Sequence, residues 1–151
     1  MKPIFALMAG QQKFPAVEDI ALLITRVGIG LAMLTHAIPK LMNFAALSQT
    51  FFDPFGLGSQ LSLIMALFAE LVCSIALILG IFTRLASAML LFTMLIAVYM
   101  VGMLKGWAGN ELATIYCFVY GLLIAFGGGK YSLENSLPIF SKLSISQQKF
   151  A

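Results

Sequence analysis

The segment TRVGIGLAMLTHAIPKL, residues 25–41, is a long apolar run that contains three basic side chains, Arg26, His36 and Lys40. The window from residue 20 to residue 38 is long enough to cross a bilayer as a helix, at about 1.5 Å per residue against about 30 Å of hydrocarbon. One arginine near the middle of such a helix costs about 2.5 to 3.5 kcal/mol of insertion free energy, which cancels much of the gain from its apolar neighbours. We therefore expect this charge to face other helices or a polar cavity, where a partner offsets its desolvation.

The composition indicates that the chain is an integral membrane protein. Of its 151 residues, 61% are hydrophobic and 10% are charged, whereas a soluble domain is about half apolar and a quarter charged. The net charge of +3 is spread over the termini and loops, so it indicates topology and excludes a nucleic-acid-binding patch. The sequence predicts a single all-α polytopic membrane domain over residues 1–151.

The apolar runs predict a bundle of four transmembrane helices. The predicted elements are an N-terminal arm at 1–17, spans at 18–38, 61–79, 85–104 and 111–126, an outer loop at 39–60 and a C-terminal tail at 127–151. Pro39 is expected to bend or end the first span. The outer loop is rich in phenylalanine and is predicted to contain a short helix near 43–51 and to cover the outer mouth of the bundle.

The loop cations predict the orientation, because four spans place both termini on one side of the membrane. Six basic residues fall on that side and two on the other, which favours cytoplasmic termini in the plasma (inner) membrane. The six are Lys2, Lys13, Arg84, Lys130, Lys142 and Lys149, and the two are Lys40 and Lys105.

A second intramembrane charge, Glu70, lies within about a residue of the midpoint of the second span. Taken at 1.5 Å per residue from each span's midpoint, Arg26 is the cation nearest to Glu70 in depth. We therefore expect Glu70 to face the first helix and to approach Arg26 more closely than any other cation. Thr83, within the short connection from Gly80 to Arg84, is expected to cap the third helix.

Four stretches of the chain resemble the DoxX family of small four-helix membrane proteins, and the likeness covers about residues 20–137. They are RVGIGLAMLTHAIPKL, FGLG, AELVCSIALILGIFTR and GGGKYSLE. The residues that fall on the family pattern are Arg26, Gly28, His36, Lys40, Glu70, Gly80, Arg84, Gly127, Gly129 and Ser132. Ala37, Ser74 and Glu134 depart from it, the first two where glycine is usual or frequent and the third where aspartate is common.

The resemblance implies a quinone-interacting redox subunit or a factor in oxidative or quinone stress. Its implied ligand-binding residues are Arg26, His36, Lys40 and Glu70, around a polar pocket between the first two spans. The expected partners are membrane lipid, a quinone-like small molecule and a protein that carries a redox cofactor, with a homo-oligomer left open. We expect neither a covalently bound cofactor nor a metal site, and His36 is the only histidine, which excludes bis-histidine haem ligation within one chain.

The sequence leaves a structural role open for each of these residues. Arg26 and Glu70 can form an ion pair that only holds the helices together, and His36 and Lys40 can satisfy themselves near the interface. Tyr116 and Tyr120, one turn apart, are interpreted as packing residues whose hydroxyls have a partner, and not as quinone contacts. The alternative function is a non-catalytic scaffold or assembly factor whose intramembrane charges are structural, and no residue is identified as catalytic.

Overall fold

The computed structural model describes residues 15–105 and 109–136, and this part of the chain is helical without a strand, as predicted. Three predicted features lie outside the described residues: the N-terminal arm up to residue 14, the turn at 106–108, and the tail beyond residue 136.

The first span is the helix α2, Pro15–Met42, which runs through Pro39. The prediction that Pro39 bends or ends the helix near residue 38 is therefore wrong about the end. A proline removes one backbone donor, but its carbonyl remains available, and the Pro39 carbonyl accepts bonds from both the backbone and side-chain amides of Asn43 at 3.1 and 2.9 Å. Lys40, in the last turn of α2, therefore lies on the same continuous helix as Arg26.

The second span changes its helical geometry in the middle. It consists of α4, Ser59–Leu67, a π-helical turn η1, Phe68–Cys73, and α5, Ser74–Leu79. Wide π turns are rare and often occur at functional sites. This one contains Glu70, the carboxylate that the sequence places at the centre of the span.

A tight turn joins the second span to α6, Thr83–Lys105. Gly80 adopts a left-handed conformation (φ 72°, ψ 43°), and the amides of Gly80 and Ile81 donate to the carbonyls of Leu77 and Ala76 at 3.0 and 2.9 Å. This is a Schellman motif, which satisfies the last carbonyls of a helix. Two further helices follow: α7, Glu111–Phe126, and the single turn α8, Leu133–Ser136.

Three helices of the described chain are long and apolar enough to cross a membrane: Ala16–Met42, Ser59–Leu79 and Thr83–Met100. The helix α7 is apolar but shorter, with 16 residues. The chain is therefore a multi-pass helical membrane protein.

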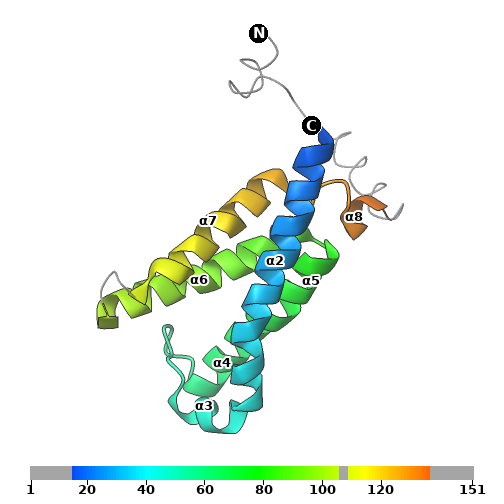
Figure 1. The fold of residues 1–151 in the computed structure, drawn as a ribbon. Helices are drawn as coiled ribbons and strands as arrows, with labels where there is room; N and C mark the ends of the chain where they lie inside the picture. The colour runs from blue at the N-terminus through cyan, green and yellow to red at the C-terminus, as the bar shows by residue number, and fades with distance from the viewer. Residues whose placement is uncertain (1–14, 106–108, 137–151) are drawn as a thin grey trace, which may run out of the picture.

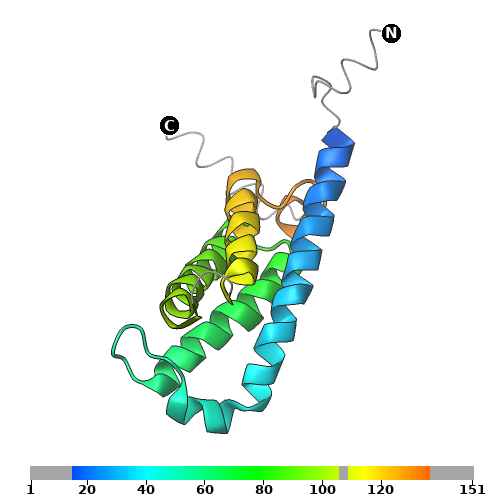
Figure 2. The same ribbon diagram turned by 60° about the vertical axis from the view of Figure 1, so that its left-hand side comes forward.

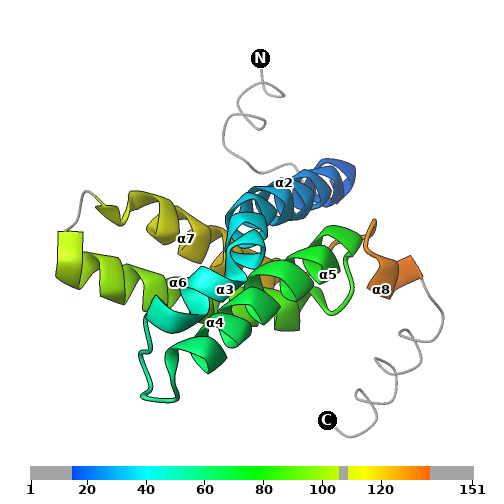
Figure 3. The same cartoon turned by 90° about the horizontal axis from the view of Figure 1, so that it is seen from below.

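The helices do not form a parallel bundle. The helices α2 and α5 pack together, and the hairpin of α6 and α7 leans across them (Figure 1). Seen from below, α6 and α7 extend to one side and α2 to the other (Figure 3). The buried core lies where these groups meet, and includes Met33 of α2, Leu77 of α5, Leu90 of α6 and Tyr120 of α7.

The two ends of the molecule differ in construction. The start of α2, the end of α7 and α8 lie toward one end, while α3, Phe44–Thr50, and the loop after it lie at the other (Figure 2). The helix α3 supplies the short helix predicted near 43–51. Phe55 stacks on Phe92 of α6, with ring centroids 6.2 Å apart, but its side chain remains about half exposed. The loop thus folds back onto α6, and its cover over the mouth of the bundle stays a prediction.

Candidate functional site

An ion pair joins the last turn of α2 to the π turn of the second span. The Lys40 ammonium donates to both carboxylate oxygens of Glu70, at 2.5 Å to Oε1 and 2.6 Å to Oε2. The Glu70 side chain is 3% exposed, whereas that of Lys40 is 30% exposed. A carboxylate buried to this degree needs such a partner, because an unpaired charge inside a membrane bundle is costly.

The predicted pairing of Glu70 with Arg26 is therefore wrong. Arg26 and Lys40 lie on one continuous helix, fourteen residues and hence about 21 Å apart along its axis, so the two cations serve opposite ends of the bundle. The depth estimate failed because it ended the first span at residue 38 and placed Lys40 at the interface. In the structure the helix continues, and the long lysine stem reaches Glu70 from the last turn.

Two tyrosines and the histidine extend the site into α7. The rings of His36 and Tyr116 meet edge to face with centroids 6.0 Å apart, and those of Tyr116 and Tyr120 are 5.8 Å apart. Tyr116 is 4% exposed and Tyr120 is fully buried. The Glu70 carboxylate acts electrostatically on both phenol hydroxyls. We call the group of His36, Lys40, Glu70, Tyr116 and Tyr120 the α2–α7 site.

One buried polar atom of the α2–α7 site has no partner among the described residues. Within the part of the chain that the structure describes, the Tyr120 hydroxyl is buried and forms no hydrogen bond. A buried polar atom without a partner costs about 1 to 3 kcal/mol, so it marks a place where an additional hydrogen-bonding group would be stabilising. The interpretation of the two tyrosines as packing residues was correct for their burial, but the expected partner of the Tyr120 hydroxyl was wrong. Their one-turn spacing was the available signal.

Arg26 forms a separate network at the other end of the bundle. Its guanidinium, in a residue that is 1% exposed, donates to the carbonyls of Leu77 at 3.5 Å and Tyr131 at 2.5 Å. Gly80 leaves room for it, since a Cβ there would overlap the guanidinium. The structure therefore does not bring Arg26 together with the other three predicted ligand residues.

The segment 127–136 completes this network, and we call it the C-terminal clasp. Within the clasp, the Glu134 carboxylate accepts the Thr83 amide at 3.0 Å, and the Glu134 amide donates to the Gly80 carbonyl at 3.0 Å. The Lys130 amide donates to the Asp19 carboxylate at 2.9 Å. The clasp thus ties the start of α2 to the turn between α5 and α6.

Glu134 replaces the cap that the sequence predicted. Thr83 begins α6, but its own hydroxyl is buried without a hydrogen bond among the described residues. The carboxylate of Glu134 instead satisfies the first backbone donor, where the positive end of the helix dipole also favours an anion. An acidic residue shortly after the glycine-rich end of α7 was the only sequence signal for this role.

The described residues offer no metal centre. No group of three or more His, Cys, Asp or Glu side chains in 15–105 and 109–136 is arranged to hold an ion. Cys73 and Cys117 are both free thiols.

Comparison with protein families decides the assignment. The family model described as DoxX matches residues 21–103, more than half of the chain. The protein belongs to the DoxX family. The resemblance drawn from the sequence is thus confirmed, and the match spans α2 to α6, with Arg26, His36, Lys40 and Glu70 inside it. No curated protein and no solved structure matches this DoxX protein.

Proposed function

We propose that this DoxX protein binds a quinone-like molecule at the α2–α7 site and serves as a redox subunit or a quinone-stress factor of the inner membrane. The buried, unpartnered hydroxyl of Tyr120 beside an intramembrane ion pair carries the proposal. A quinone-type head group has carbonyl oxygens, which accept hydrogen bonds from ammonium, imidazole and phenol donors. Lys40, His36 and Tyr120 supply one donor of each kind.

Glu70 and Arg26 have different roles in this proposal. Glu70 holds Lys40 in place and offers a carboxylate that can take up or release a proton close to the ligand. Arg26, which was expected among the ligand residues, instead supports the fold through the carbonyls of Leu77 and Tyr131. A redox role would need a diffusible quinone, which accepts electrons and protons to become a quinol, or a protein partner that carries a redox cofactor.

The proposed topology has four membrane crossings with cytoplasmic termini. The six-to-two distribution of loop cations supports it. The start of α2 and the end of α7 also lie toward the same end (Figure 1). In intact cells, a thiol reagent outside the membrane should label Ser48→Cys and leave Ser144→Cys unlabelled, and labelling of Ser144→Cys would overturn this orientation.

The ion pair also supports a second function, a membrane scaffold or assembly factor. Lys40 contacts both oxygens of Glu70, so each charge has its partner within the protein. The pair can therefore act purely to hold α2 against the second span. A scaffold of this kind needs no small ligand, and a homo-oligomer or a protein partner would be its functional form.

Binding of a short-chain ubiquinone analogue to the purified protein in detergent separates the two functions. The quinone proposal expects binding, with Glu70→Gln and Tyr120→Phe each weakening it by about tenfold, since 1.4 kcal/mol corresponds to a factor of ten. The matched controls are Glu111→Gln, an exposed acid in the first turn of α7, and Tyr99→Phe, an exposed tyrosine of α6. Both should bind as the wild type does.

Stability gives a second readout in the same experiment. Because Tyr120→Phe removes a buried unpaired hydroxyl, it should leave the ligand-free melting temperature unchanged or raise it while still weakening binding. Absence of binding to the wild type, with an unchanged melting temperature, would overturn the quinone proposal and favour the scaffold.

A further inference from the structure

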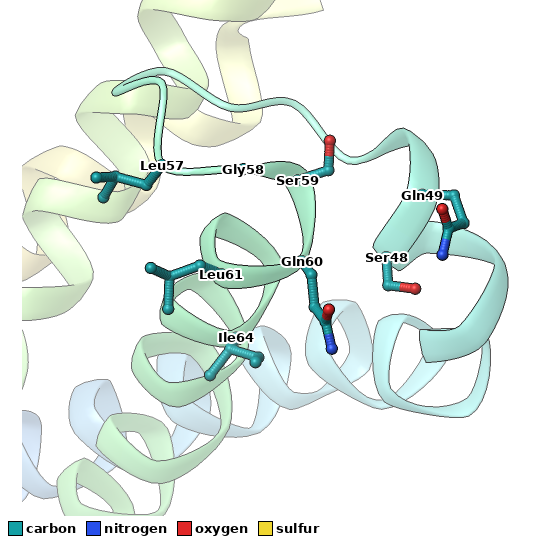
Figure 4. Close-up of a pocket in the computed structure, with 8 residues that line it drawn as sticks. All are labelled: Ser48, Gln49, Leu57, Gly58, Ser59, Gln60, Leu61 and Ile64. Carbon is teal, nitrogen blue, oxygen red and sulfur yellow. The ribbon is translucent and has the colours of Figure 1, made fainter.

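A groove of about 620 Å³ opens at the loop end of the molecule, between the end of α3 and the start of α4. Figure 4 shows its eight lining residues, with Gln49 on α3 and the side chain of Gln60 extending from the start of α4. None of the residues of the α2–α7 site lines this groove. It is therefore a second, separate feature of the protein.

The lining of the groove is polar but uncharged. Within the described chain, the side chains of Gln49, Ser59 and Gln60 form no hydrogen bond with the protein, so their donors and acceptors are free. Each amide offers two donors and one acceptor oxygen, and each hydroxyl offers both functions. Such a surface matches a ligand with several hydroxyl groups, which also donate and accept.

The neighbouring residue Asp53 does not change the uncharged character of the groove lining. Asp53 directs its carboxylate to the Gly58 amide at 2.5 Å and to the Ser62 hydroxyl at 2.8 Å, so its oxygens are engaged within the loop. None of the eight described lining residues is basic or acidic. The groove therefore has no charge complementary to a phosphate or to an ammonium group, because recognition of either relies on charged partners.

The position of the groove indicates that its ligand also has an apolar part. Ser59 is the first residue of the second membrane-spanning helix, so the groove lies where that span begins. Leu61 and Ile64 line the same groove further along the span, and they are 46% and 45% exposed. A ligand that fills the groove would thus meet polar groups near the membrane surface and apolar side chains toward the membrane interior.

We propose that this groove binds the uncharged, hydroxyl-rich head group of a membrane lipid, with the acyl chains along Leu61 and Ile64. A free sugar would satisfy Gln49 and Gln60 but would leave both apolar side chains uncovered, so the geometry favours a lipid-linked sugar. The site lies outside the α2–α7 site, and its occupant needs no redox chemistry.

Lipid retention by the full chain tests this assignment. The protein is purified in detergent and exposed to equal amounts of a monoglucosyl diacylglycerol and of a phosphatidylglycerol with the same acyl chains, and the retained lipids are measured by native mass spectrometry. The wild type should retain the glucolipid preferentially. The double variant Gln49→Leu, Gln60→Leu should lose that preference by about tenfold, since each lost hydrogen bond contributes roughly a factor of two to ten.

The control is Thr35→Val, an exposed polar residue of α2 whose hydroxyl bonds only to the Ala32 carbonyl of its own helix. It should retain the glucolipid as the wild type does. Preferential retention of phosphatidylglycerol, or equal retention of both lipids by the wild type, would overturn the proposal without any variant. Binding of methyl glucoside as tight as that of the glucolipid would overturn the lipid assignment.

Discussion

Two cations of one helix, Arg26 and Lys40, are held in opposite ways. Arg26 is almost completely buried and donates to two backbone carbonyls, one of which, that of Tyr131, belongs to the C-terminal clasp. Lys40 is 30% exposed and has a carboxylate as its partner. A guanidinium held by backbone carbonyls is fixed in place, whereas a partly exposed ammonium can reorganise with its carboxylate partner around a ligand. The buried charge of Arg26 thus stabilises the fold at one end of the molecule, and the Lys40–Glu70 pair marks a candidate binding site at the other.

The largest expected effect comes from crowding Arg26. Gly80→Ala should destabilise the protein by at least about 3 kcal/mol, because it strains a left-handed residue and displaces a buried charge from its partners. The control is Gly56→Ala, which has a similar φ of 69° but nothing within 4 Å of the added methyl. It should cost only about 1 to 2 kcal/mol of backbone strain.

Unfolding free energies measured by denaturation in mixed detergent micelles compare these two variants directly. If Gly56→Ala and Gly80→Ala lost the same stability, the tight packing around Arg26 would have no energetic consequence, and the contrast between the two cations would fail.

An intermediate effect is expected from a double-mutant cycle on the ion pair. Lys40→Met and Glu70→Gln should show a coupling free energy of about 1 to 3 kcal/mol, as groups in direct contact do. Arg26→Met combined with Glu70→Gln should be additive within about 0.5 kcal/mol, because the two residues share no hydrogen bond in the described structure. Stronger coupling of Glu70 to Arg26 than to Lys40 would reverse the assignment of partners.

The smallest effect concerns Asp53 in the loop between α3 and α4. The Gly58 amide, with further bonds from Ser62 and from the backbone of Leu57 and Phe55, lowers the pKa of Asp53 below its usual value of 3.8. A lowered folded-state pKa means that the contribution of Asp53 to loop stability is present above the unfolded pKa and is lost as the pH falls through the folded pKa.

Hydrogen exchange at the Gly58 amide measures this effect. After correction for the intrinsic pH dependence of exchange, protection should be constant above about pH 5 and should decrease below the usual carboxyl pKa near 4. Asp53→Asn should remove the decrease, since it no longer titrates. The same loss of protection in that variant would mean that another group is responsible.

Part of the candidate site could be predicted from single residues. His36, Lys40 and Glu70 each interrupt an apolar run, and the cost of such polar groups in a bilayer makes them candidates without any structure. Tyr120 gave only its one-turn spacing from Tyr116 as a signal, because a tyrosine in an apolar helix is usually a packing residue. Its importance depends on the absence of a partner for its hydroxyl among the described residues, which only coordinates reveal.

The sequence by itself determined the helical membrane class, the positions of the long apolar helices to within a few residues and the charges that need partners, because hydropathy acts on each segment independently. The partners themselves were decided by the tertiary structure. A π turn around Glu70, the continuation of α2 past Pro39 and the return of Glu134 to the start of α6 each set a rotation or a long-range contact. Which cation meets a carboxylate depends on such rotations, since one residue turns a side chain by about 100° around a helix and depth along the membrane normal does not record it.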